Sequence, residues 1–190
     1  MRIRKNNSTY SKTDRRIIAA AARVFRRRHH LTISAKEISR EAGIASSSFY
    51  IHYHSLAELI DKNESKIIDG IKKILRKKNI SSDSLEDIFR SVLFFLYKNR
   101  DLIEIIIDSE CLAIQMKVMD TLRPHITRAW LSYKSEVMDR LFHLVSFSFV
   151  AEISIWKKEN FSVDTILRHA QRLAVMSESI PRLFVQLYYK

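Results

Sequence analysis

Hydroxyl and basic side chains gather between residues 34 and 55 of this 190-residue sequence. Three of them are the consecutive serines Ser46, Ser47 and Ser48. A serine hydroxyl is short enough to approach a phosphate or a base edge closely, but it accepts several bases and therefore specifies a sequence weakly. Each of these serines is explained about equally well as a helix cap. The candidate nucleic-acid contacts of the segment are Ser34, Lys36, Ser46, Ser47, Ser48, Tyr50, His54 and Ser55.

Other kinds of site are not supported by the spacing of the reactive residue types. Serine, histidine and aspartate occur, but none stands in a recognisable nucleophile motif. His52 and His54 are two residues apart on an expected helix, so they do not share a face. The single cysteine, Cys111, excludes a disulfide framework and a zinc site with several cysteines. We therefore expect no catalytic residues, no bound metal and no cofactor.

The positive charge of the sequence is confined to one part of it. The chain has 33 basic and 21 acidic residues and a net charge of +12. Residues 1–80 contain 19 basic and 7 acidic residues, whereas residues 81–190 contain 14 of each. A basic segment joined to a neutral one indicates a module that binds a polyanion, either a nucleic acid or an anionic membrane surface.

The composition predicts an all-α fold. Only two glycines and two prolines occur, whereas sheet proteins need these residues in their tight turns. Gly43 and Gly70 are too far apart to form a glycine-rich phosphate loop. No run of 18 apolar residues occurs, and the first residues are not followed by the apolar stretch of a secretory signal. We therefore expect a helical, soluble, cytoplasmic protein that does not span a membrane.

Two short helices separated by a glycine are expected to position the hydroxyl residues. Ser34 and Glu37 form a capping box, which predicts a helix over residues 35–42, and Gly43 suits the left-handed residue that ends it. A second short helix is expected over residues 46–53, with Ser46–Ser48 able to cap it. A glycine-containing turn between two such helices is the signature of a helix-turn-helix motif. The neighbouring expected helices cover residues 12–28 and 56–78, the latter beginning with the capping box of Ser55 and Glu58.

The remaining sequence is expected to form longer amphipathic helices. Pro124 suits the first turn of a helix that we expect to run unbroken to about Lys158. The last two helices carry more apolar residues than one copy of residues 81–190 needs, which favours a four-helix interface between two copies. Candidate interface residues are Phe149, Ile153, Trp156, Ile166 and Leu173. The other expected helices cover residues 84–98, 100–119 and 163–188, with Pro181 kinking or restarting the last.

The residues around the glycine turn resemble the DNA-binding domain of the TetR-type transcriptional regulators. The resemblance is carried by residues 17–25, 38–53 and 55–59, and the spacing from Phe25 to Leu59 agrees with that family without a gap. It covers about a quarter of the chain, and residues 142–156 look like the dimer-forming end of the family. Two positions depart from the pattern: His29 replaces a usual glycine, and Leu56 replaces a lysine that commonly reaches a DNA phosphate.

The resemblance implies a ligand-responsive repressor that binds an inverted-repeat duplex DNA operator as a homodimer. Tyr50 would then donate its hydroxyl to a phosphate, and an unknown small-molecule effector would bind among the later helices. Arg2, Arg4, Lys5 and Lys12 would belong to an arm lying along the DNA. The implied organisation is a basic arm over residues 1–11, a DNA-binding domain over 12–55 with its motif at about 34–53, a connecting helix over 56–80, and an effector-binding and dimerisation domain over 81–190.

One alternative from a different class stays open at this stage. A basic helical adaptor that binds an anionic membrane surface would also explain the charge of residues 1–80. The capping boxes and the turn glycine distinguish the two hypotheses, because a lipid-binding helix needs neither short helices nor Gly43. The sequence therefore favours the DNA-binding regulator.

Overall fold

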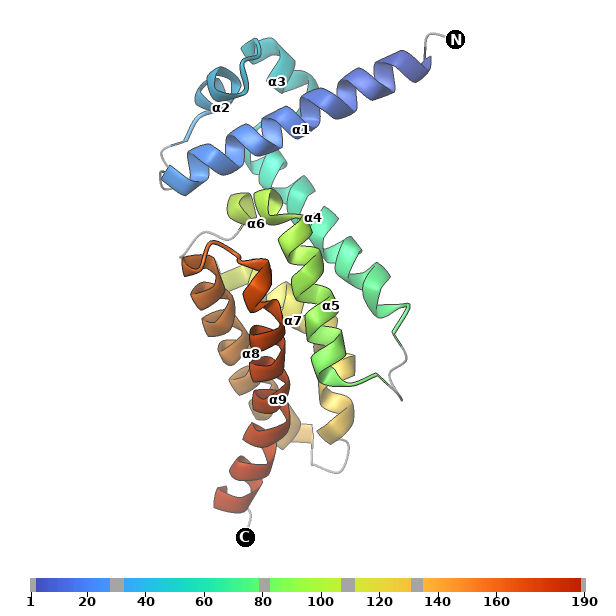
Figure 1. Ribbon diagram of the computed structural model, residues 1–190, viewed down its shortest axis with the longest axis vertical. Helices are drawn as coiled ribbons and strands as arrows, with labels where there is room; N and C mark the ends of the chain where they lie inside the picture. Colours follow the sequence, from blue (N-terminus) through green and yellow to red (C-terminus); the bar gives the residue numbers. More distant parts are fainter. Residues whose placement is uncertain (1–2, 28–32, 79–82, 107–111, 131–134, 189–190) are drawn as a thin grey trace. The chain divides into compact units, whose positions relative to one another are not determined.

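The computed structural model describes residues 3–27, 33–78, 83–106, 112–130 and 135–188, and within these ranges the fold is all-α with no strand (Figure 1). The expected fold class is thereby confirmed. The α-helices are α1 (Ile3–Arg27), α2 (Ala35–Ala42), α3 (Ser46–His52), α4 (Leu56–Leu75), α5 (Leu85–Lys98), α6 (Arg100–Ile106), α7 (Leu112–Thr127), α8 (Ser135–Lys158) and α9 (Ile166–Tyr188). Two short 3₁₀ helices, η2 (Arg128–Trp130) and η3 (Val163–Thr165), follow α7 and precede α9.

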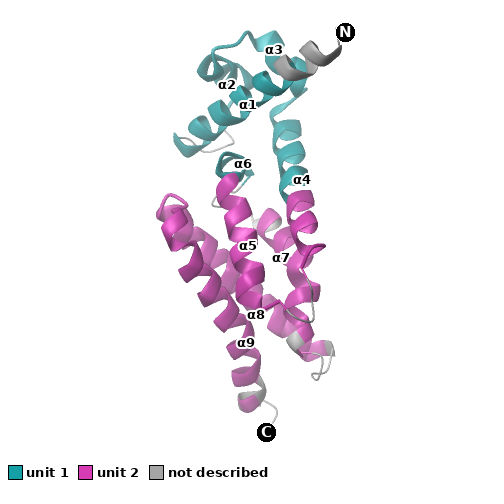
Figure 2. Cartoon of the chain, turned by 45° about the vertical axis from the view of Figure 1, so that its right-hand side comes forward, with its two compact units in different colours: residues 1–67, 99–110 teal, residues 68–98, 111–190 magenta. Residues whose placement is uncertain are grey.

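The chain divides into two compact units, coloured separately in Figure 2. Unit 1 comprises residues 1–67 and 99–110, and unit 2 comprises residues 68–98 and 111–190. This division differs from the expected boundary near residue 80, because α6 belongs to unit 1 and α4 contributes to both units. This division could not be predicted from the sequence, since α6 follows α5 after a single residue.

Unit 1 is built around α1, which packs against α2 and α6 (Figure 1). Its core contains Ile17 and Val24 of α1, Ile38 of α2, Phe49 of α3 and Leu59 of α4, all fully buried or nearly so. The inward residues of α1 and α2 recur at the i, i+3, i+4 spacing that predicted these helices. Residues that carry the resemblance, from Ile17 to Leu59, are thus buried together in the core of unit 1.

The expected N-terminal arm is helical. Residues 3–11 belong to α1, so the helix expected over 12–28 begins nine residues earlier, at Ile3. The error came from the apolar pattern, which starts only where α1 begins to touch the core of unit 1. Lys12 is exposed on α1, whereas Arg2 lies outside the described residues.

Unit 2 is held together by α5, α8 and α9, which pack side by side, and by α7 against α8 (Figure 1). Its largest buried side chains include Phe89, Trp130, Phe142, Phe149 and Trp156. The indole nitrogen of Trp130 donates a hydrogen bond to the carbonyl oxygen of Ser177, 3.0 Å away, which satisfies its buried N–H group.

The helices around Pro124 differ from those expected. Pro124 lies inside α7, which ends at Thr127, and α8 begins at Ser135. The prediction of one unbroken helix from Pro124 to Lys158 was therefore wrong. A helix accommodates a proline at the loss of one backbone hydrogen bond, and α7 does so in its last turns. Pro181 likewise lies within α9 and does not interrupt it.

The expected helix over residues 100–119 is also two helices. The first, α6, ends at Ile106 and belongs to unit 1, and the second, α7, begins at Leu112 and belongs to unit 2. An apolar pattern reports helical periodicity but not a change of packing partner. For that reason the periodicity continued across a boundary between the units.

Candidate nucleic-acid interface

The turn between α2 and α3 has the geometry that the sequence predicted. The hydroxyl of Ser34 accepts a hydrogen bond from the backbone N–H of Glu37 at 3.2 Å and so caps α2. At the other end, Gly43 has φ 61° and ψ 42°, the left-handed conformation that glycine adopts without steric cost. The N–H of Ile44 then donates to the carbonyl of Ser39 at 3.0 Å. These bonds fix the angle at which the chain leaves α2 and enters α3.

Arginines of α1 hold α2 and its turn in place. The guanidinium of Arg16 donates to the carbonyl oxygens of Ala42 and Gly43, at 2.8 and 3.0 Å. Arg23 and Arg27 pair with the two carboxylate oxygens of Glu41, at 2.7 and 2.8 Å. Their hydrogen bonds hold the pKa of Glu41 below its ordinary value. Arg16 therefore holds the turn through neutral carbonyl oxygens, and Arg23 and Arg27 share the single carboxylate of Glu41.

The inward face of α3 is anchored to α1 by aromatic residues. Phe49 is fully buried, and the hydroxyl of Tyr53 donates to Oδ1 of Asp14 at 2.5 Å. Burial, and then this hydrogen bond to Asp14, raises the pKa of Tyr53 above its ordinary value. The ring of His52 stacks on that of Tyr10 at a centroid distance of 3.9 Å, and burial lowers the pKa of His52. The orientation of α3 is thus fixed from its inner side.

The outward face of α3 carries the residues that the sequence singled out. Ala45 occupies the N-cap position of α3, and no side chain caps this end. The interpretation of Ser46–Ser48 as caps was therefore wrong. Ser46 and Ser47 are exposed and Ser48 is half-buried, so at least two hydroxyls face outward. Tyr50 and Ile51 are also exposed, at 52% and 71%.

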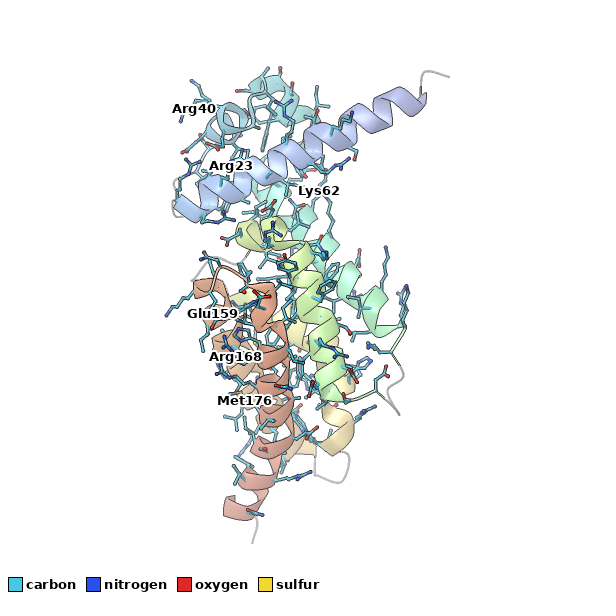
Figure 3. All side chains as sticks on the ribbon, in the orientation of Figure 1. Arg23, Arg40, Lys62, Glu159, Arg168 and Met176 are labelled. Atoms are coloured by element: carbon cyan, nitrogen blue, oxygen red, sulfur yellow. The ribbon has the colours of Figure 1, made fainter. Side chains whose placement is uncertain are left out.

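A concave surface lies between α2 and the start of α3. Lys36 and Arg40 are exposed on α2, one helical turn apart, and within the described part of the chain neither forms an ion pair. Figure 3 labels Arg40, which projects from α2. Sequence reasoning missed Arg40, although its i+4 spacing from Lys36 was a signal that could have found it. The residues lining the concavity are Ser34, Lys36, Glu37, Arg40, Ile44, Ala45 and Ser46.

The remaining candidate contacts lie at the start of α4. The hydroxyl of Ser55 accepts from the N–H of Glu58 at 3.1 Å, which confirms the second capping box. Glu58 accepts in turn from the backbone N–H of His54 at 2.5 Å and lies 2.7 Å from Nδ1 of His54 and from Nζ of Lys62. The hydrogen bond from Lys62 is the largest cause that lowers the pKa of Glu58 to about 2, and the hydrogen bonds from His54 are the next largest. His54 and Ser55 are exposed, whereas Leu56 is half-buried.

The candidate contact residues therefore separate into two groups. Ser34, Lys36 and Ser46 line the concavity, and Ser47 and Tyr50 are exposed on α3. His54 and Ser55 form the second group and are exposed just before α4. Ser34 and Ser55 also act as helix caps, but a hydroxyl that accepts a backbone hydrogen bond can still donate its own proton to a phosphate. The surface presents hydroxyl and cationic groups that can donate hydrogen bonds. Phosphate oxygens and base edges accept hydrogen bonds from such groups.

The five candidate dimer residues require a correction. Phe149, Ile153, Trp156, Ile166 and Leu173 are buried within unit 2 of a single chain, with at most 5% of each residue exposed. Burial of Trp156 and Phe149 was expected, but side chains covered by their own chain present little surface to a second copy. The apolar residues that α8 and α9 leave exposed are instead Leu144, Phe147, Ile155, Leu167, Val175 and Leu183.

Comparison of the sequence with models of known protein families, and with curated proteins, found no match. Among the described residues there is no group of three or more histidine, cysteine, aspartate or glutamate side chains arranged to hold a metal ion. Cys111 lies outside those residues. None of the helices that the structure describes combines the length and apolar character needed to cross a membrane.

Proposed function

We propose that this protein is a sequence-specific DNA-binding transcriptional regulator of the TetR type, in which α3 reads the major groove of duplex DNA. The observation that carries the proposal is the arrangement of α2 and α3 around Gly43. The inner face of α3 is buried, and its outer face carries serine hydroxyls that cap no helix. In a helix-turn-helix the second helix enters the major groove while the first crosses the backbone. The exposed residues of α3 and the cations of α2 suit those two tasks.

The charges of α2 supply the sequence-independent part of the binding. Lys36 and Arg40 have no acidic partner among the described residues, so contact with phosphates costs no ion pair. Each phosphate that is neutralised releases counterions. It thereby contributes about −0.9 to the slope of the logarithm of the binding constant against the logarithm of the salt concentration. The exposed hydroxyls of Ser46, Ser47 and Tyr50 add hydrogen bonds to phosphates or base edges.

The regulator is proposed to act as a homodimer through α8 and α9. Leu144, Phe147 and Ile155 recur on α8 at spacings of three and eight residues, which places them on one outward stripe. Val175 and Leu183 on α9 are separated by eight residues and are also exposed. Two such helices from each of two copies form a four-helix interface of the usual isologous kind.

An effector would bind in unit 2. A largely apolar groove of about 390 Å³ lies between α5 and the start of α9, within the size range of roughly 300–1,000 Å³ found for small-molecule sites. Phe94, Val163 and Leu167 provide apolar walls, and Arg90 provides a cation at the groove. We propose that an unknown small molecule binds there and changes operator affinity, repression being the expected mode.

Selection of duplexes from a random pool tests the proposal. We expect a short inverted-repeat duplex to be enriched, with affinity falling steeply as salt is raised. The double variant Lys36→Ala/Arg40→Ala should weaken binding to all duplexes and reduce the salt slope by about two per subunit. Removal of two exposed charges from unit 2, in Lys98→Ala/Lys117→Ala, should leave both the affinity and the salt slope unchanged. No enrichment of any duplex over random DNA would contradict the proposal.

A second candidate function, binding to an anionic membrane surface, is favoured by a different observation. Five cations occur within seven residues at the end of α4, in unit 2, and none has an ion pair in the described ranges. Ile71 and Leu75 of the same segment are buried, so few apolar side chains remain for insertion into lipid. Binding to phosphatidylserine vesicles but not to duplex DNA would support this function. The cations are Lys72, Lys73, Arg76, Lys77 and Lys78.

A further inference from the structure

One apolar side chain stands on the otherwise polar outer face of α3. The exposed residues of this seven-residue helix are Ser46, Ser47, Tyr50 and Ile51. Ile51 has 71% of its surface exposed, the largest fraction among the exposed large apolar residues that the structure describes. It lies one helical turn after Ser47, as Tyr50 does after Ser46, so these two pairs make up the exposed side of α3.

Ile51 has no part in holding α3 in place. The anchoring residues are Phe49, His52 and Tyr53, which are 0%, 5% and 2% exposed and face the core of unit 1. Because a seven-residue helix presents so few outward positions, each one determines a large share of what the helix can contact. An exposed isoleucine next to a half-exposed tyrosine is therefore a feature of the contact surface and not of the core.

The chemistry of the major groove identifies what Ile51 fits. Each base edge offers hydrogen-bond donors and acceptors there, and thymine alone of the four standard bases adds an apolar group, its C5-methyl. Serine and tyrosine hydroxyls both donate and accept, so they discriminate weakly between bases. On the outer face of α3, Ile51 is thus the side chain with an unambiguous preference.

We propose that Ile51 packs against the C5-methyl group of a thymine in each half-site and makes that position the most strongly specified one under α3. This inference rests on the proposed DNA-binding function and names the base chemistry that the helix reads. Desolvating a methyl group against an aliphatic side chain is favourable, whereas a cytosine or adenine at that position would leave its amino group facing an apolar surface. Specificity for thymine then follows both from the favourable contact with its methyl group and from the unfavourable burial of an amino group of cytosine or adenine.

The test removes one methyl group from the DNA at a time. Each thymine of a duplex selected by the unaltered protein is replaced by deoxyuridine, which lacks only the C5-methyl. We expect one thymine per half-site at which the replacement weakens binding by about fourfold, the effect of one buried methyl group. In Ile51→Ala the same replacement should have no effect at that position, because the partner of the methyl is gone.

Two control variants keep the result interpretable. Ile51→Val shortens the side chain by one carbon and should retain part of the sensitivity to deoxyuridine. Lys117→Ala, at an exposed position of unit 2, should retain all of it. Because Ile51 is exposed, its variants should unfold at the same temperature as the unaltered protein, which thermal melting verifies.

The outcomes separate this inference from the proposed function. If no duplex is selected, the DNA-binding function itself fails. If a duplex is selected but no thymine responds to deoxyuridine, or if Ile51→Ala keeps the full response, the thymine contact is overturned while the function stands. A uniform loss of affinity of Ile51→Ala for every duplex, with the deoxyuridine response intact, overturns it as well.

Discussion

Nδ1 of His169 lies 2.7 Å from Oε1 of Glu152, and both side chains are almost entirely buried in unit 2. The other ring nitrogen, Nε2, lies 3.0 Å from Oε2 of Glu159, in the turn after α8. Each ring nitrogen of His169 therefore lies within hydrogen-bond distance of a different carboxylate. Arg172 and Arg168 complete the group by pairing with Glu152 and Glu159. His169 therefore ties α9 to two points of the preceding helix and turn.

Replacement of His169 by leucine should destabilise unit 2 strongly. The substitution leaves the buried side chain of Glu152 without its closest hydrogen-bond partner, and a buried polar group that loses its partner costs about 1–3 kcal/mol. The free energy of unfolding from urea titration measures the loss. His143→Leu, at an exposed position of α8, is the matched control and should change the stability little. Equal stability of the two variants would show that the bonds of His169 contribute nothing.

The cap at the start of α4 should weaken in acid. The pKa of Glu58 is lowered from 4.5 to about 2, chiefly by its bond from Lys62. Because the folded-state pKa is the lower one, the stabilisation is fully present above pH 4.5 and is lost as the pH falls from there to about 2. Glu58→Gln should therefore be less stable than the unaltered protein at pH 7, and the difference should shrink below pH 4. A difference that stays constant with pH would contradict this assignment.

The sequence allowed the local structure of unit 1 to be predicted, because each signal there acts over a few residues. The caps of Ser34 and Ser55 and the left-handed Gly43 depend only on neighbouring backbone groups. The boundary between the units was not predictable in the same way. It depends on which surface α6 packs against, and α1 satisfies that requirement from about 80 residues away.

The sequence indicated which residue types make up the candidate site. It did not indicate which of these residues cap a helix, which are buried and which are exposed. Ser46 and Ser47 fit a cap or a contact equally well in the sequence. The position of Ala45 at the helix start excludes the cap, and the contact stays a prediction. The dimer residues were misassigned for a related reason. Apolar spacing identifies an apolar face of α8, but it does not tell whether the chain itself covers Trp156 or leaves Phe147 exposed.

Gly70 should resist replacement by alanine although it lies within α4. A β-carbon at this position would stand 2.0 Å from Cζ of Phe95 on α5. Overpacking of this kind costs about 1–3 kcal/mol, which outweighs the gain of about 1 kcal/mol in helix propensity. Gly70→Ala should therefore lower the melting temperature. In a Phe95→Leu background the same change should become neutral or stabilising, and a stabilising effect with Phe95 in place would refute the close approach.

Phe147 should control association of the chain with itself. Its side chain is 61% exposed on the outward stripe of α8, and a buried aromatic residue at the centre of an interface typically contributes 2 kcal/mol or more. Phe147→Lys should therefore raise the dimer dissociation constant by at least about thirtyfold in sedimentation experiments, without loss of helicity, because the residue supports no core. Phe94→Lys changes an exposed aromatic residue of α5 that lies off the stripe, and it should leave association unchanged. A monomeric unaltered protein at micromolar concentration, or equal effects of the two lysines, would show that α8 does not form the interface.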